Sequence, residues 1–162
     1  MLLSRAFVIA GLCLLAACAD FRVQTAGEVL RQQEIGINVL QSGGRDGQLY
    51  SRQLREQLGS DGTTTHDLSS SLSQSSSSVV AVRGTGSQLK KMTMTAKIKL
   101  VDSRSGKVVL KDSISSTATL GAVSSYFAQT RSDRHGNERL AMLLADRVAA
   151  RVQLYFLNNS GS

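Results

Sequence analysis

The sequence predicts an α+β fold, a two-layer sandwich in which two helices pack on one face of a four-stranded, mostly antiparallel sheet. The first observation is a strict alternation of apolar and polar residues from 92 to 100, which is typical of a half-buried strand. The second is an apolar repeat in four-residue steps from Leu140 to Phe156, which is typical of a helix with one buried face. The third is the order of the elements, because a strand and a helix are followed by three strands and a second helix.

A hairpin between residues 89 and 120 forms the centre of the predicted sheet. The apolar residues at alternate positions of its first strand share one face: Met92, Met94, Ala96, Ile98 and Leu100. Residues 102–106, Asp-Ser-Arg-Ser-Gly, suit a chain reversal, and a second strand runs back from residue 107. Because an isolated hairpin is only marginally stable in water, its apolar face needs a cover.

The elements before the hairpin are a short strand, a helix and a long strand. The short strand is expected at residues 35–40, and the helix from Gly47 to Leu58 follows, with Asp46 as its N-cap and Gly59 as the C′ residue that stops it. The serine-rich residues 66–82 predict one long, partly exposed strand with a bulge, because two leucines keep even spacing and the run ends in Val-Val-Ala-Val. A low-complexity linker is the alternative for this segment.

The last helix is expected to begin at Ser132 or Asp133 and to cover the sheet with its apolar face. Residues 121–130 before it are predicted to form a loop in which Tyr126 and Phe127 are available to pack. Fully burying each large apolar side chain of this helix stabilises the fold by about 1.5–3 kcal/mol before entropy is counted. The helix is therefore expected to be essential to the fold.

The N-terminus predicts a lipoprotein signal. Arg5 precedes an apolar run, and Leu15-Ala16-Ala17-Cys18 has the pattern of a bacterial lipobox, so Cys18 is expected to carry a diacylglyceryl group and a further acyl chain such as palmitate. The alternatives are an ordinary cleaved signal peptide and a signal-anchor helix, although the run is shorter than the ~20 residues of a membrane span. The predicted organisation is a signal peptide at 1–17, a lipidated cysteine and tether at 18–32, a single α+β domain at 33–158 and a tail at 159–162.

The charge favours anionic partners, since the formal net charge is +7 and the pI is about 9.9. Nucleic acid, anionic lipid and an acidic protein surface all fit this charge. The aromatic content is only 4%, and no aromatic residues interleave with the basic ones to stack on bases, so a nucleic-acid partner is not expected.

Groups for catalysis or cofactor binding are sparse. His66 and His135 are isolated, and no His, Cys or acidic cluster has the spacing of a metal site. The serines lack a G-x-S-x-G elbow, and the glycines at 84 and 86 lack the G-K-[ST] ending of a phosphate loop. We therefore expect no enzymatic activity, no catalytic residue, no metal and no cofactor.

Basic residues crowd the hairpin, where Asp102 is the only acidic residue among them. The alternation places Lys97 and Lys99 on the face away from the core. Such a stripe either keeps a sheet face soluble or docks a polyanion, such as a phosphorylated lipid, or an acidic protein wall. Its members are Arg83, Lys90, Lys91, Lys97, Lys99, Arg104, Lys107 and Lys111.

Several stretches together resemble the LptE family, the lipopolysaccharide-assembly lipoproteins of the outer membrane, and most closely its α-proteobacterial kind. One departure is Val23, which stands where a proline is common after Phe21-Arg22. The matching stretches are the lipobox cysteine, residues 48–54, the serine-rich strand leading to 80–86, residues 93–102, residues 125–128, residues 144–148 and residues 154–156.

The resemblance implies a domain that plugs the β-barrel LptD, assists its assembly and binds lipopolysaccharide, on the periplasmic side of the outer membrane. The candidate lipopolysaccharide-binding residues are Arg83, Lys90, Lys91, Lys97 and Lys99. Two other classes stay open, namely a periplasm-facing lipoprotein scaffold of another envelope complex and a tethered hydrolase that uses the serines.

Overall fold

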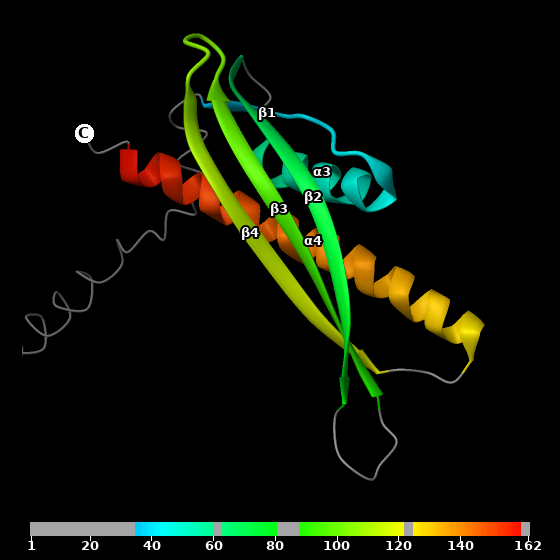
Figure 1. Ribbon diagram of the computed structural model, residues 1–162. Coiled ribbons are helices and arrows are strands. Elements are labelled where there is room, and N and C mark those ends of the chain that lie inside the picture. The colour runs from blue at the N-terminus through cyan, green and yellow to red at the C-terminus, as the bar shows by residue number, and fades with distance from the viewer. Residues whose placement is uncertain (1–34, 60–62, 81–87, 122–124, 160–162) are drawn as a thin grey trace, which may run out of the picture.

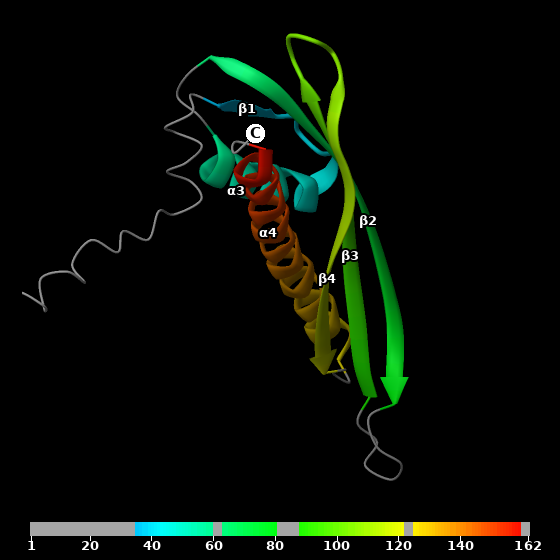
Figure 2. The ribbon, with the colours of Figure 1, turned by 90° about the vertical axis from the view of Figure 1, so that its left-hand side faces the viewer.

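The computed structural model describes residues 35–59, 63–80, 88–121 and 125–159. They form two layers, a sheet and a pair of helices that cover one of its faces (Figures 1 and 2). The predicted α+β sandwich is therefore confirmed. The expected signal peptide, Cys18, the tether and Arg83 lie outside the described residues.

The sheet has the strand order β1-β2-β3-β4. β1 runs parallel to β2, whereas β2–β3 and β3–β4 are antiparallel pairs, so the sheet is mixed but mostly antiparallel as predicted. The strands span Gly36–Val39 (β1), Thr64–Val80 (β2), Gln88–Asp102 (β3) and Val108–Gly121 (β4).

The serine-rich segment is a strand and not a linker. The bulge predicted in it is absent from its pairing with β3, where the register runs without a shift from His66 opposite Asp102 to Val80 opposite Gln88. Small serine side chains fit both faces of the pleat without crowding, so nothing forces an extra residue into the strand. Register shifts occur instead between Gly36 and Ile37 in the β1–β2 pair and between Leu100 and Val101 in the β3–β4 pair.

Helix α3 spans Gly44–Leu58 and begins three residues before the predicted start. Gly43 is the N-cap, and Gly44 adopts a φ of 77°, which glycine reaches without strain, so this pair and not Asp46 turns the chain into the helix. Asp46 lies in the first turn, where its charge favours the helix dipole. Gly59 ends the helix as predicted, but with a φ of −58° and not in a left-handed turn.

Helix α4 spans Tyr126–Asn159, so the prediction of a loop through Thr130 and a helix start at Ser132 or Asp133 was wrong. The added turns are held by polar bonds between residues four apart. The Gln129 amide donates to the Ser125 carbonyl at 2.9 Å, and Thr130 Oγ1 donates to the Tyr126 carbonyl at 2.9 Å. At 34 residues the helix is about 51 Å long, which lets it run along most of the sheet.

The core lies between the two layers. α4 packs on β3 and β4, α3 packs on β1, and the helices pack on each other. Tyr50 reaches across from α3, and its hydroxyl bonds with Ser70 Oγ at 3.0 Å, while burial raises the pKa of Tyr50 to about 12. The largest fully buried apolar side chains include Leu54, Leu68, Met92, Met94, Ile98, Leu100, Leu140, Leu144, Val148 and Val152.

Candidate functional site

The face of the sheet that the helices leave uncovered is polar and basic, and we call it the outer sheet face. Its residues alternate with the buried residues of β2, β3 and β4 and are exposed or half-buried. Within residues 69–77 of β2, 91–99 of β3 and 111–119 of β4, each of them is a serine, a threonine or a lysine: Ser69, Ser71, Ser73, Ser75, Ser77, Lys91, Thr93, Thr95, Lys97, Lys99, Lys111, Ser113, Ser115, Thr117 and Thr119.

Three of the four lysines of the outer sheet face, Lys97, Lys99 and Lys111, lie close together. Lys99 lies directly opposite Lys111 in the β3–β4 ladder, and Lys97 is two residues earlier in β3, on the same face. Like charges directly opposite each other destabilise a sheet, so stability alone does not favour this arrangement. A bound anion that bridges the ammonium groups would relieve their repulsion.

Hydroxyl groups surround these lysines. Lys97 has Ser71 on one side and Ser113 on the other, while Lys91 lies between Ser77 and Thr119. Such side chains donate and accept hydrogen bonds and are short enough to leave the lysines accessible. The outer sheet face therefore combines positive charge with an array of hydrogen-bonding groups, a combination that suits phosphate and sugar hydroxyls.

The acidic residues near this face already have partners. Asp67, beyond Ser69 on β2, accepts hydrogen bonds from Asn38 Nδ2 at 2.7 Å and Ser103 Oγ at 3.1 Å. Asp112 pairs with Arg151 of α4 at 2.7 Å. The hydrogen bond from the Ser113 amide, helped by Arg151, lowers the pKa of Asp112. These carboxylates therefore have hydrogen-bond or ion-pair partners other than the clustered lysines.

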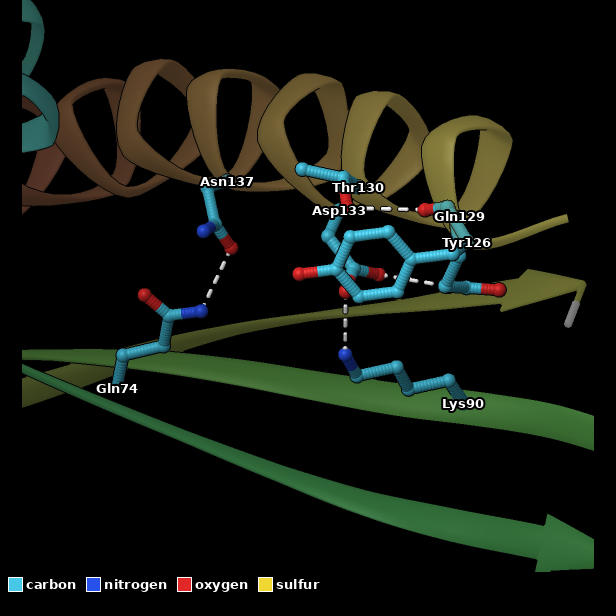
Figure 3. Close-up of polar contacts among 7 residues, drawn as sticks. All are labelled: Gln74, Lys90, Tyr126, Gln129, Thr130, Asp133 and Asn137. Carbon is cyan, nitrogen blue, oxygen red and sulfur yellow. Dashed lines mark hydrogen bonds and ion pairs between the residues drawn. The ribbon is translucent and has the colours of Figure 1, made fainter.

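Lys90 lies apart from the other candidate lysines. Its ammonium group forms an ion pair with Asp133 of α4 at 2.7 Å, and the side chains are 30% and 28% exposed. Gln129 Nε2 also donates to Asp133 at 2.8 Å, as Figure 3 shows. The hydrogen bond from Lys90 lowers the pKa of Asp133. Lys90 thus joins β3 to α4 on the covered face, whereas Lys91, Lys97 and Lys99 lie on the outer sheet face.

Two aromatic residues at the start of α4 do not pack as predicted. Tyr126 is 80% exposed and Phe127 is 83% exposed, and their rings contact each other edge to face with centroids 6.0 Å apart. Both lie in the first turn of α4, and their exposure shows that neither ring is packed into the core. Sequence reasoning also missed the hydroxyl ladder of β4, although Ser113, Ser115 and the threonines at 117 and 119 alternate along that strand.

His66 is half-buried and, among the described residues, belongs to no group that could hold a metal ion. His66 packs edge to face against Phe156 with ring centroids 5.0 Å apart, and its Nδ1 lies 2.9 Å from Thr65 Oγ1. Burial lowers its pKa, although Asp102 and Asp67 oppose this shift. In the described part of the chain no group of His, Cys, Asp or Glu residues is placed to hold a metal ion. Neither described helix combines the length and the apolar character needed to span a membrane.

The fold recurs in solved structures of low sequence identity. A Caulobacter crescentus protein described as a lipoprotein is 21% identical, with a TM-score of 0.58 over 75% of this chain and 90% of that chain. The rare lipoprotein B of Shewanella oneidensis is 11% identical, with a TM-score of 0.59 over 78% of this chain and 98% of that chain. A minor lipoprotein of Acinetobacter baumannii is 11% identical, with a TM-score of 0.51 over 73% and 90% of the two chains. The class defined by this fold is a two-layer α+β domain found in bacterial lipoproteins.

The family follows from the sequence itself. The family model described as LptE, lipopolysaccharide-assembly, matches residues 33–152. This match covers most of the chain, so the chain belongs to the LptE family, and the resemblance found in the sequence is confirmed. No curated protein matches the chain. Family membership assigns the chain a role in lipopolysaccharide assembly.

Proposed function

We propose that this chain is a lipoprotein of the outer membrane, anchored through Cys18 on the periplasmic side, that plugs and helps assemble the LptD β-barrel and binds lipopolysaccharide on its outer sheet face. It acts by binding and catalyses no reaction. Family membership supports the assembly role. The single observation that carries the binding role is the opposition of Lys99 and Lys111 on an uncovered face of hydroxyl groups.

The chemistry of this face matches a phosphorylated glycolipid. Ammonium groups form charge-assisted hydrogen bonds with phosphate oxygens, and serine and threonine hydroxyls bond to sugars. Lys91, Lys97 and Lys99 are the candidate residues that share this face, and Lys111 joins them. Arg83, which precedes β3 in the sequence, remains a candidate. Lys90 is engaged with Asp133, so in this proposal it supports the fold and contributes less to binding.

Reversing two charges on the outer sheet face, with a control that reverses two charges on the helix layer, tests the binding role. The double variant Lys97→Glu and Lys99→Glu is expected to bind purified lipopolysaccharide at least about tenfold more weakly, because two attractive contacts become repulsive. The matched control reverses Arg52 and Arg139, which are exposed on the helix layer, and changes the net charge equally. Equal loss in both variants would reduce the effect to net charge, and unchanged binding in the first variant would remove the assigned site.

The barrel partner is tested separately from the lipid. A tagged full chain extracted from membranes in mild detergent is expected to bring down LptD, and the Lys97→Glu and Lys99→Glu variant is expected to do so as well. Recovery of a different envelope protein without LptD would favour the alternative, a lipoprotein scaffold of another complex. Mass spectrometry of the same material tests Cys18, since acylation raises the mass of the N-terminal peptide and a free thiol would contradict the anchor.

A further inference from the structure

β2 is much longer than the strand beside it, so part of its outer edge is open. β1 pairs with β2 only from Thr64 to Leu68, and Ser42 Oγ then donates to the Ser70 carbonyl at 3.1 Å. Beyond Ser70, no described segment pairs with this edge (Figures 1 and 2).

The hydrogen bonds at the covered start of this edge show which residues of β2 turn their backbone groups toward it. The Leu68 carbonyl accepts from the Leu40 amide at 3.0 Å, and the Ser70 carbonyl faces the same side. In an antiparallel ladder alternate residues turn both backbone groups to one side. The residues that present an N–H and a C=O on the open edge are therefore Leu72, Gln74, Ser76 and Ser78.

This edge lacks the features that protect strand edges. Between Leu68 and Val80 the sequence has no charged residue, proline or glycine, and the register has no bulge. The opposite edge, β4, is blocked in part by side chains near its middle. The Ser113 amide donates to Asp112 Oδ1 at 2.8 Å, and Arg147 Nη1 donates to the Ser115 carbonyl at 2.7 Å. The β4 edge is thus partly protected, whereas the described edge of β2 beyond Ser70 is open.

The side chains on both faces of this edge indicate what it accepts. On the outer sheet face the short serines leave Lys91 and Lys97 within reach, because a strand added to β2 would lie about 10 Å from β3. On the other face a hollow of about 200 Å³ opens beside the edge, lined by the start of α3, including Arg45 and Asp46, and by Leu72, Gln74 and Met94 of the sheet. Carboxylates fit the first face, and on the second face Leu72 and Met94 offer the apolar contact that an apolar side chain would make.

We propose that the edge from Leu72 to Ser78 accepts an extended segment of another protein as an additional strand, with acidic residues at alternate positions toward Lys91 and Lys97 and apolar residues between them. Main-chain hydrogen bonds would supply affinity and the alternating side chains specificity. A second copy fits less well, because its formal charge of +7 repels another copy and its edge offers serines in place of carboxylates. This contact goes beyond the proposed lipid-binding role and does not depend on it.

The test uses the full chain in detergent micelles and a ten-residue acetylated peptide of alternating glutamate and valine. Amide hydrogen exchange is followed by NMR. With peptide, the backbone amides of Leu72, Gln74, Ser76 and Ser78 are expected to exchange at least about tenfold more slowly. The exchange rates of the β3 amides that bond to neighbouring strands are expected to stay the same. A peptide with lysine in place of glutamate, and one N-methylated along its bonding edge, are expected to give no protection.

Proline substitution separates this edge from the fold. Ser76→Pro removes an N–H that bonds to nothing in the described chain, so the variant is expected to fold and to lose the protection at Leu72 and Gln74. Ser76→Ala keeps the N–H and is expected to retain the protection by the peptide. Where Ser76→Pro does not fold, the N-methylated peptide on the unchanged chain decides the same question.

Three outcomes would overturn the proposal. The first is unchanged exchange at these four amides with peptide at millimolar concentration. The second is equal protection by either control peptide: by the lysine peptide, which would show that charge does not govern the contact, or by the N-methylated peptide, which would show that main-chain bonding does not. The third is protection that rises with protein concentration in the absence of peptide, which would identify a second copy as the occupant.

Discussion

Lys99 of β3 and Lys111 of β4 face each other directly across the antiparallel ladder on the uncovered side of the sheet. Ladders normally avoid such a pair, because the repulsion between like charges opposes folding. The proposed binding of an anion on this face of serines, threonines and lysines accounts for the presence of the pair. Removing one lysine of this pair is then expected to raise the stability of the domain and to lower its affinity for an anion.

Replacing one member of the pair tests this relationship. Lys111→Thr is expected to raise the free energy of unfolding by about 0.2–1 kcal/mol, measured by chemical denaturation, because the repulsion is removed and threonine favours strands. Its affinity for lipopolysaccharide is expected to fall. Lys91→Thr is the matched control, since Lys91 lies between Ser77 and Thr119 and faces no like charge. An equal gain in stability from both substitutions would trace the effect to strand propensity alone.

The ion pair between Lys90 and Asp133 predicts a dependence of stability on acid. The pKa of Asp133 is lowered in the folded chain, so its charged form stabilises the fold above the unfolded-state pKa, which is about 4 for an aspartate. This contribution is lost as the pH falls through the folded-state pKa. Asp133→Asn is expected to be less stable than the unchanged chain at pH 7 and to approach it at pH 2–3, in thermal unfolding monitored by circular dichroism.

A charge control accompanies that variant. Glu56→Gln removes an acidic charge from the exposed surface of α3. It is expected to change the unfolding temperature at pH 7 less than Asp133→Asn does. If both variants lower the unfolding temperature equally, the effect is one of net charge and the Lys90–Asp133 pair makes no specific contribution.

Alternation in the sequence was a strong guide where one strand has a buried face. It placed the alternate apolar residues from Met92 to Leu100 in the core. It placed Lys97 and Lys99, which lie between them, on the outer sheet face, and the structure confirms both placements. The same rule separates Lys90 from Lys91, because Lys90 shares its parity with Met92. The pairing of Lys90 with Asp133 depends on where α4 crosses the sheet, which is a long-range relationship that spacing along the chain does not contain.

The helix starts show what local signals leave out. Asp46 and Asp133 are good capping residues, yet α3 begins at Gly44 and α4 at Tyr126. In α3 the turn depends on the positive φ of Gly44. In α4 the polar bonds of the first turns extend the helix toward its N-terminus to Tyr126, whose side chain stays exposed. Capping propensity identifies possible starts, and the packing and the backbone select among them.

His66 predicts a second dependence on pH. Burial against Phe156 lowers the pKa of His66, so the folded chain binds a proton there less readily than the unfolded chain. Its contribution to stability is present above the unfolded-state pKa, which is about 6.5 for a histidine, and is lost as the pH falls below it toward the folded-state pKa. The unchanged chain is expected to unfold at a lower temperature at pH 5.5 than at pH 7.5.

The variant His66→Phe keeps a ring against Phe156 and cannot be protonated. Its unfolding temperature is expected to fall less between these two pH values than that of the unchanged chain. His135 is the matched position, since its side chain is 85% exposed, and His135→Phe is expected to keep the dependence of the unchanged chain. A dependence that His66→Phe leaves intact would exclude His66 as its source.

Two neighbouring leucines of α4 test whether this helix holds the fold together. Leu144 is fully buried in the core between the two layers, whereas Leu143 is 48% exposed. Leu144→Ala is expected to cost about 2–5 kcal/mol in the free energy of unfolding, because it leaves a cavity in the core. Leu143→Ala removes the same atoms from a side chain that borders solvent and is expected to cost less than about 1 kcal/mol. Equal losses in urea denaturation would show that α4 does not bury the face seen in the structure.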